Sequence, residues 1–171
     1  MEIRDETPAD ETAIRRLTDT AFAGAEHASG TEGAIIDALR RTGALTLSLV
    51  GAAADEIVGH AAFSPVGIAG LDGGWFGLGP IAVLPARQRA GIGAALIGTG
   101  LARLSAQGAA GCVVLGDPGY YARFGFAPHP GLRFDGVPPE YFMALAFAGA
   151  PPAGAVVYHP AFYAADPDTL P

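Results

Sequence analysis

The sequence predicts a mixed α/β fold in which helices flank a largely antiparallel central sheet. Three strand-like runs follow one another at 45–50, 56–68 and 75–85, separated by the turn-rich segments "GAAAD" and "AGLDGG". Consecutive strands joined by short turns form an antiparallel meander. Helix-like stretches stand on both sides of this meander, and no internal repeat or linker interrupts the 171 residues. We therefore expect a single domain over residues 1–171, with a C-terminal extension from about 150.

A strand and two helices are predicted before the meander. "EIRDE" at 2–6 is a short strand, and Thr7 followed by Pro8 is typical of a helix start. Apolar residues recur at helical spacing from Ile14 onward. A polar joint then leads to a second helix over roughly 31–42, which has an apolar face and two arginines in its last turn.

The elements after the meander alternate helix and strand. We expect, in order, a helix at about 90–106, a buried strand at 111–116, a short helix at 118–124 and a strand at 141–148. Gly93 and Gly100 lie on the apolar side of the long helix and would let it approach the sheet closely. The pattern of the last twenty residues or so predicts a short extended segment with a loose end.

Composition excludes several classes of protein. The formal net charge is −7, and the ten basic residues are all arginines, so a basic face for nucleic acid is not expected. No apolar run approaches the roughly 20 residues of a membrane span. The first residues are acidic and polar, unlike a signal peptide. A single cysteine, Cys112, allows neither an internal disulfide nor a cysteine metal cluster. We expect a cytoplasmic protein without metal, monomeric or homodimeric, with no nucleic acid or membrane partner.

The loop "LPARQRAGIGAAL" at 84–96 carries the clearest functional signal. It combines arginines and a glutamine with glycines and then becomes a helix. It lacks the Gly-Lys-Ser/Thr of a P-loop and the G-x-G-x-x-G of a dinucleotide fold. The pattern that remains is an anion held by backbone N–H groups at a helix N-terminus, with Arg87 and Arg89 as flanking cations.

Two motifs resemble those of the GNAT-superfamily N-acetyltransferases. "QRAGIG" at 88–93 is similar to their Q/R-x-x-G-x-G/A signature, and "GDPGYYARFGF" at 116–126 places Tyr121 four residues before Gly125. "GHAAFSPV", "LGPIAVLP" and "PPEYFMALAF" also resemble one bacterial branch of predicted acetyltransferases. The resemblance implies a GNAT-like fold, acetyl-CoA as co-substrate and direct acetyl transfer to a primary amine of a small molecule. The alternatives are a non-catalytic acyl-CoA-binding sensor and an acetyltransferase acting on protein N-termini or lysines.

The resemblance also implies which residues hold the cofactor. The sheet should splay between the strands at about 75–84 and 111–116, and the pantetheine arm should pair with the first of them. Asp117 could bind the amine or simply cap the short helix, and Arg123 could meet a CoA phosphate or stay solvated. The expected cofactor-binding residues are Ile81, Ala82, Val83, Gln88, Arg89, Ala90, Gly91, Ile92, Gly93, Ala94 and Asp117.

Tyr121 is the expected general acid. A phenol with a pKa near 10 stays protonated at neutral pH and can protonate a departing thiolate. Tyr120 is expected to be structural or part of the cofactor site, and Cys112 a buried structural thiol. The identity of the general base stays open, and a chain of waters could deprotonate the amine instead. The expected acceptor-side residues are Glu26, His27, Glu32 and His60.

Overall fold

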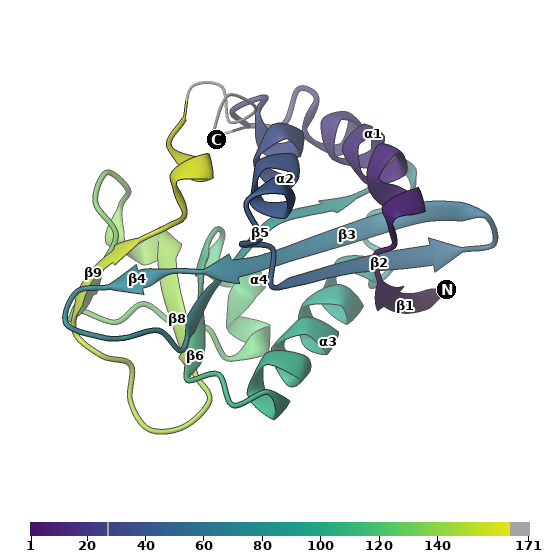
Figure 1. Cartoon of the computed structure of the whole chain (residues 1–171). Helices are drawn as coiled ribbons and strands as arrows, with labels where there is room; N and C mark the ends of the chain where they lie inside the picture. The colour runs from purple at the N-terminus through teal and green to yellow at the C-terminus, as the bar shows by residue number, and fades with distance from the viewer. Residues whose placement is uncertain (27, 165–171) are drawn as a thin grey trace.

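The computed structural model describes residues 1–26 and 28–164, and its centre is a six-stranded sheet (Figure 1). The strand order is β1-β2-β3-β5-β6-β8, and every neighbouring pair is antiparallel except β5 and β6. The strands are β1 (Glu2–Asp5), β2 (Leu47–Ala53), β3 (Glu56–Pro65), β5 (Trp75–Val83), β6 (Gly111–Leu115) and β8 (Phe142–Ala146). This confirms the expected mixed α/β fold with a largely antiparallel sheet.

Helices cover both faces of this sheet. Helices α1 (Glu11–Phe22) and α2 (Glu32–Arg41) lie on one face, and α3 (Ile92–Ala106) lies on the other (Figure 1). The short helix α4 (Pro118–Tyr121) follows β6 directly. Within the described part of the chain, none of the helices combines the length and apolar character that crossing a membrane requires.

Glycines let α3 pack closely against β3. A Cβ atom at Gly59 would lie 2.7 Å from Ile92 Cγ2, and one at Gly100 would lie 2.2 Å from Cζ of Phe63. Both distances are shorter than carbon atoms can approach, so neither position has room for a side chain. The close approach buries the apolar side of the helix, and Leu96 on it is completely buried. The same close packing also fixes the position of the N-terminus of α3 relative to the sheet.

The central sheet splits between β5 and β6. These parallel strands pair only from Trp75 with Gly111 to Leu78 with Val114. Beyond Leu78, β5 continues to Val83 while keeping its pairing with β3. Its other edge over residues 79–83 therefore has no strand partner among the described residues. This confirms the predicted splay and creates an opening in the middle of the sheet.

A small second sheet differs from the expectations. The run at 56–68 was predicted as one strand, but it divides into β3 and β4 (Gly67–Ile68). The latter pairs with β9 (Gly154–Val157) in the order β4-β9-β7, with β7 at Leu132–Arg133. The reason is the pairing partner: after Pro65 the chain leaves β5 and meets the C-terminal segment instead.

The C-terminal segment is packed against the rest of the chain over its described part, and the predicted loose end falls on residues 165–171, which lie outside the described residues. Tyr158 and Ala161 are both buried, and Ala161 lies in an apolar cluster with Ile35 and Leu39 of α2. The segment follows the α2 side of the sheet in Figure 1. Residues 154–164 are therefore part of the fold.

Candidate active site

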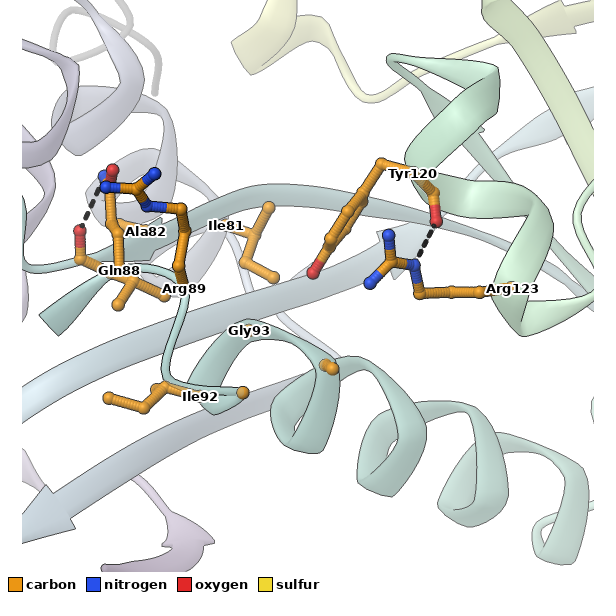
Figure 2. A pocket seen from close by; sticks show the side chains of 11 residues that line it. Ile81, Ala82, Gln88, Arg89, Ile92, Gly93, Tyr120 and Arg123 are labelled. Atoms are coloured by element: carbon orange, nitrogen blue, oxygen red, sulfur yellow. Dashed lines mark hydrogen bonds between the residues drawn. The ribbon is translucent and has the colours of Figure 1, made fainter.

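A cavity of about 620 Å³ lies beside the split in the sheet. Three segments of the chain surround it: the free part of β5, the loop leading into α3, and α4 with the turn that follows (Figure 2). Its lining residues are Ile81, Ala82, Val83, Gln88, Arg89, Gly91, Ile92, Gly93, Ala94, Tyr120 and Arg123. Nine of the eleven are among the expected cofactor-binding residues.

The N-terminus of α3 faces this cavity without a side-chain cap. Its N-cap residue is Gly91, with φ +83°, and the first helical hydrogen bond runs from Ala95 N–H to Gly91 C=O at 3.0 Å. The N–H groups of the first turn have no intrahelical acceptor. Unpartnered N–H groups and the positive end of the helix dipole favour an anion at this position.

The loop before α3 reinforces this anion site. Arg89 has φ +61°, a left-handed conformation that is unusual for a residue with a side chain. Gln88 lies against β5, where its side-chain amide donates to the Val83 carbonyl at 3.3 Å. Loop backbone strain of this kind is often found at ligand sites. The loop thus brings one cation and several N–H groups to the same end of the cavity.

The free edge of β5 forms a second side of the cavity. Ile81, Ala82 and Val83 all line it, and Figure 2 shows the strand passing above the start of α3. A strand edge without a partner offers backbone donors and acceptors to an extended ligand. The cavity therefore combines an anion-binding site with a strand edge that can hydrogen-bond to an extended ligand.

Tyr120 and Arg123 form the third side. The Tyr120 hydroxyl points toward the space above Gly93 in Figure 2. Arg123 donates from Nε to the Tyr120 carbonyl at 2.9 Å, and its guanidinium carbon lies 4.6 Å from the centre of the Tyr120 ring. The ring holds the cation in place by a cation–π contact. Tyr120 therefore lines the cavity, and its contact with a cofactor stays a prediction.

Tyr121 lies deeper than Tyr120, where the sheet splits. It is 8% exposed and does not line the cavity. A Cβ atom at Gly116, just after β6, would lie 2.4 Å from its ring, and Phe126 packs edge-on at 6.0 Å between centroids. Burial, with smaller effects of Tyr120 and Cys112, raises the pKa of Tyr121 to about 12. The phenol is therefore protonated at neutral pH.

Two of the expected cofactor residues lie outside the cavity lining. Asp117 caps α4, because its carboxylate accepts from Gly119 N–H at 2.9 Å. This is the capping alternative that the sequence also allowed. Ala90 is an exposed residue of the loop between Arg89 and Gly91 and does not reach the cavity surface.

The expected acceptor-side residues are not brought together at this cavity. Glu26 is exposed, and Glu32 accepts hydrogen bonds from the backbone and side chain of Ser29, at 2.6 and 3.0 Å. His60 is completely buried on β3. His27 lies outside the described residues.

Cys112 is buried in the core. Its exposure is 0%, and burial raises the pKa of the thiol well above its usual range. A thiol that stays protonated is a poor nucleophile. Among the described residues, His, Cys, Asp and Glu form no group of three or more suited to holding a metal ion.

The sequence left open whether Arg123 belongs to the site. Its signal was the three-residue spacing from Tyr120, which places both side chains on one side of a helical turn. That spacing is common on solvated helices, so only the position of α4 beside the split shows that the pair lines a cavity.

Known proteins resemble this chain in sequence and fold. Residues 12–126 match the acetyltransferase (GNAT) family. The uncharacterized N-acetyltransferase YhbS of Escherichia coli K12 is 41% identical over 137 residues, covering 78% of each chain. A GNAT family acetyltransferase from Brucella melitensis, solved with acetyl-CoA, is 50% identical with a TM-score of 0.85, covering 94% of this chain and 97% of that one. The E. coli YhbS structure, solved with CoA, is 34% identical with a TM-score of 0.87, covering 95% and 92%. Together with the split sheet and the uncapped helix beside it, these matches show that the chain belongs to the GNAT acetyltransferase family.

Proposed function

We propose that this protein transfers an acetyl group from acetyl-CoA to a primary amine of a small molecule. The observation that carries the proposal is that the uncapped N-terminus of α3 and the unpaired edge of β5 open into one cavity. Acetyl-CoA has a pyrophosphate, which suits the helix end, and an amide-bearing arm, which suits the strand edge. The Brucella relative was solved with acetyl-CoA and E. coli YhbS with CoA, which supports the same ligand here.

The loop and helix start would bind the pyrophosphate. Backbone N–H groups from Gln88 to Ala94 supply donors, and Arg89 and Arg123 supply positive charge from opposite sides. The pantetheine arm would then run along Ile81–Val83 like an added strand. This orientation directs the thioester toward the point where β5 and β6 meet.

The residues at that point would carry the chemistry. The amine nitrogen attacks the thioester carbon, the C–N bond forms, and the C–S bond breaks. Ile81 is the first residue after Pro80 with a backbone N–H, which would stabilise the carbonyl oxygen. Tyr121 would donate its phenol proton to the departing sulfur. Direct attack requires no covalent enzyme intermediate, in agreement with the buried and protonated Cys112.

Calorimetric titration with CoA, followed by an assay of thiol release from acetyl-CoA, tests this function. The amines offered should include tyramine, putrescine, kanamycin, an Ala-Phe dipeptide and a lysine-containing peptide. Acetylation of a small amine would support the proposal. Binding of CoA without turnover on any amine would identify a sensor, and turnover on the peptides alone would identify a protein acetyltransferase. The chain contains no lysine, so acetylated lysine found by mass spectrometry must come from the added peptide.

A further inference from the structure

A chain of polar side chains leads from the interior of the sheet to α2. His60 Nε2 on β3 lies 2.8 Å from Ser48 Oγ on β2, and Ser48 Oγ donates a short hydrogen bond to Glu6. Arg40 on α2 donates to both oxygens of the Glu6 carboxylate, at 2.7 and 3.0 Å. His60 and Ser48 are buried, whereas the Glu6 side chain is 15% exposed. The four residues are far apart in sequence, so no local pattern indicated their contact.

These contacts determine which nitrogen of His60 carries the proton. Burial alone would raise the pKa of Glu6, but the neighbouring His60 and Arg40 side chains lower it to about 2. Glu6 is therefore ionised and can only accept hydrogen bonds. The single hydroxyl hydrogen of Ser48 points to Glu6, so Ser48 Oγ must accept from His60 Nε2–H. In neutral His60, Nδ1 then holds a lone pair.

That lone pair has no hydrogen-bond donor in the described structure. Among the described residues, His60 Nδ1 is one of three buried side-chain polar atoms without a partner, together with Ser64 Oγ and Tyr158 Oη. Leaving a buried acceptor unsatisfied costs free energy, and such groups are rare in folded proteins. His60 thus presents a basic nitrogen that is oriented through its other nitrogen and is unused by the fold itself.

His60 is one strand away from the split in the sheet. It is the register partner of Ala82 on β5, so the two side chains share one face of the sheet. Ala82 itself lines the cavity, and past Leu78 the other edge of β5 pairs with no strand of the part of the chain that the structure describes. Of the strands, β5 is the one that lies between β3 and this opening, and its residue opposite His60 is the small Ala82.

We propose that His60 Nδ1 is the acceptor for the proton released by the attacking amine, and that Ser48 and Glu6 hold it in the competent tautomer. The proposal rests on the proposed function and assigns the general base that the sequence left open. Because His60 does not line the cavity, the proton reaches it through a bridging water. The negative charge of Glu6, relayed by Ser48, stabilises the imidazolium that forms.

Protons and bonds balance in this scheme. The amine nitrogen forms a bond to the acetyl carbon and releases one proton to His60 Nδ1. The thioester C–S bond breaks, and the sulfur takes one proton from Tyr121. His60 then returns a proton to solvent and Tyr121 regains one, so the net change is acetyl transfer with formation of CoA thiol. No oxidant or metal takes part.

The charged groups around His60 give the pH dependence its sign. Glu6 and Arg40 are the charged side chains that act on it, and the strands beside it, β2 and β5, add no ionisable group to its surroundings. Burial lowers the pKa of His60 and Glu6 opposes that effect. The rate should therefore fall on the acid side, below the ordinary histidine pKa, as Nδ1 becomes protonated.

Three variants test the assignment against pH profiles of kcat/KM for whichever probe amine the wild-type protein acetylates. His60→Asn should lower kcat/KM by about 10²–10⁴-fold and remove the acid limb, with CoA affinity unchanged. Glu6→Gln and Ser48→Ala should keep the limb but move it to lower pH, because the imidazolium loses the charge of Glu6 in the first variant and the hydrogen bond that connects it to Glu6 in the second. Ser64→Ala is the matched control, since it removes another buried, unpartnered polar atom from the same strand. It should leave the profile unchanged.

A second measurement does not depend on turnover. Nitrogen NMR of the ¹⁵N-histidine-labelled protein should show His60 as the Nε2–H tautomer at neutral pH, and Ser48→Ala should disturb that tautomer. An Nδ1–H tautomer would overturn the proposal, as would an active wild type whose acid limb survives in His60→Asn. If the wild type acetylates none of the amines, the proposed function fails and this assignment fails with it. The tautomer would then still show whether the polar chain is as described.

Discussion

Gly93 on α3 and Tyr120 on α4 face each other across the cavity, and a Cβ atom at Gly93 would lie 3.2 Å from the Tyr120 hydroxyl oxygen. The two residues belong to different segments, and their approach sets the width of the cavity at this point. Val83 and Ile81 of β5 are the next nearest neighbours, at 3.7 and 4.0 Å from the same position. Any side chain at Gly93 would therefore occupy the space proposed for acetyl-CoA.

Gly93→Leu should weaken CoA binding by at least about tenfold, or about 1.4 kcal/mol, because the leucine would fill the cavity next to Tyr120. Calorimetric titration with CoA measures this directly. Gly98→Leu is the matched control: Gly98 is on the same helix, is exposed, and has no atom within 4 Å of its Cβ position. Equal CoA affinity in the two folded variants would refute the proposed binding mode.

Tyr121→Phe should lower kcat by about 10²–10⁴-fold while the KM for acetyl-CoA stays near the wild-type value, because only the proton donor is lost. The phenylalanine ring keeps the packing against Gly116 and Phe126. Tyr120→Phe provides the comparison, since Tyr120 lines the cavity and should affect KM more than kcat. Steady-state kinetics of both variants would decide the assignment. A Tyr121→Phe protein with wild-type kcat would show that another group protonates the sulfur.

Cys112→Ala should remain active, because direct transfer of the acetyl group uses no thiol. Cys112 is fully buried, so its truncation should cost about 1 kcal/mol of unfolding free energy by leaving a small cavity. Urea unfolding and the thiol-release assay measure the two effects separately. Trapping an acetylated Cys112 during turnover would contradict direct attack.

Asp10→Asn should destabilise the protein at neutral pH by about 1–2 kcal/mol. Arg4 donates to both Asp10 oxygens, at 2.7 and 3.0 Å, and the Thr7 backbone N–H donates at 2.7 Å. The Arg4 hydrogen bonds hold the pKa of Asp10 well below its usual range. A lowered pKa in the folded state means that the stabilisation is present above the unfolded-state pKa near 4 and is lost as the pH falls further.

Urea unfolding of the wild type and of Asp10→Asn between pH 7 and pH 2 measures this effect. The difference between the two proteins should shrink as the pH falls. Asp55→Asn, at an exposed turn between β2 and β3, controls for the loss of one negative charge. A constant difference across the pH range would show that the Asp10 carboxylate contributes through shape rather than charge.

Local sequence patterns predicted most of the secondary structure and the half of the site that is continuous in sequence. The loop at 84–96 contains its own glycines, arginines and helix start, so an anion-binding role could be predicted from neighbouring residues. The division of the run at 56–68 could not be predicted, because it depends on the pairing of β4 with β9, about 90 residues further along the chain. Periodicity shows that a segment is extended but does not indicate its partner.

The same limit applies to single side chains. Asp117 suits both a ligand contact and a helix cap, and only the 2.9 Å hydrogen bond to Gly119 distinguishes between them. His60 could be placed on a strand from sequence, but its contact with Ser48 and Glu6 arises from the pairing of β2 with β3 and the position of β1 beside them. Tertiary pairing therefore determines which polar residues meet.

The unpaired edge of β5 bears on how this protein avoids aggregation. An exposed strand edge is a place where another chain can add itself and begin a growing sheet. Here the edge is recessed, with β6 converging on one side and α3 and α4 enclosing the opening. Neighbouring strands lie about 4.8 Å apart, so such an opening admits one thin extended molecule, whereas a folded sheet is too wide. The recess therefore leaves the edge accessible to a thin extended ligand, and we expect it to hinder pairing with a strand that already belongs to a folded sheet.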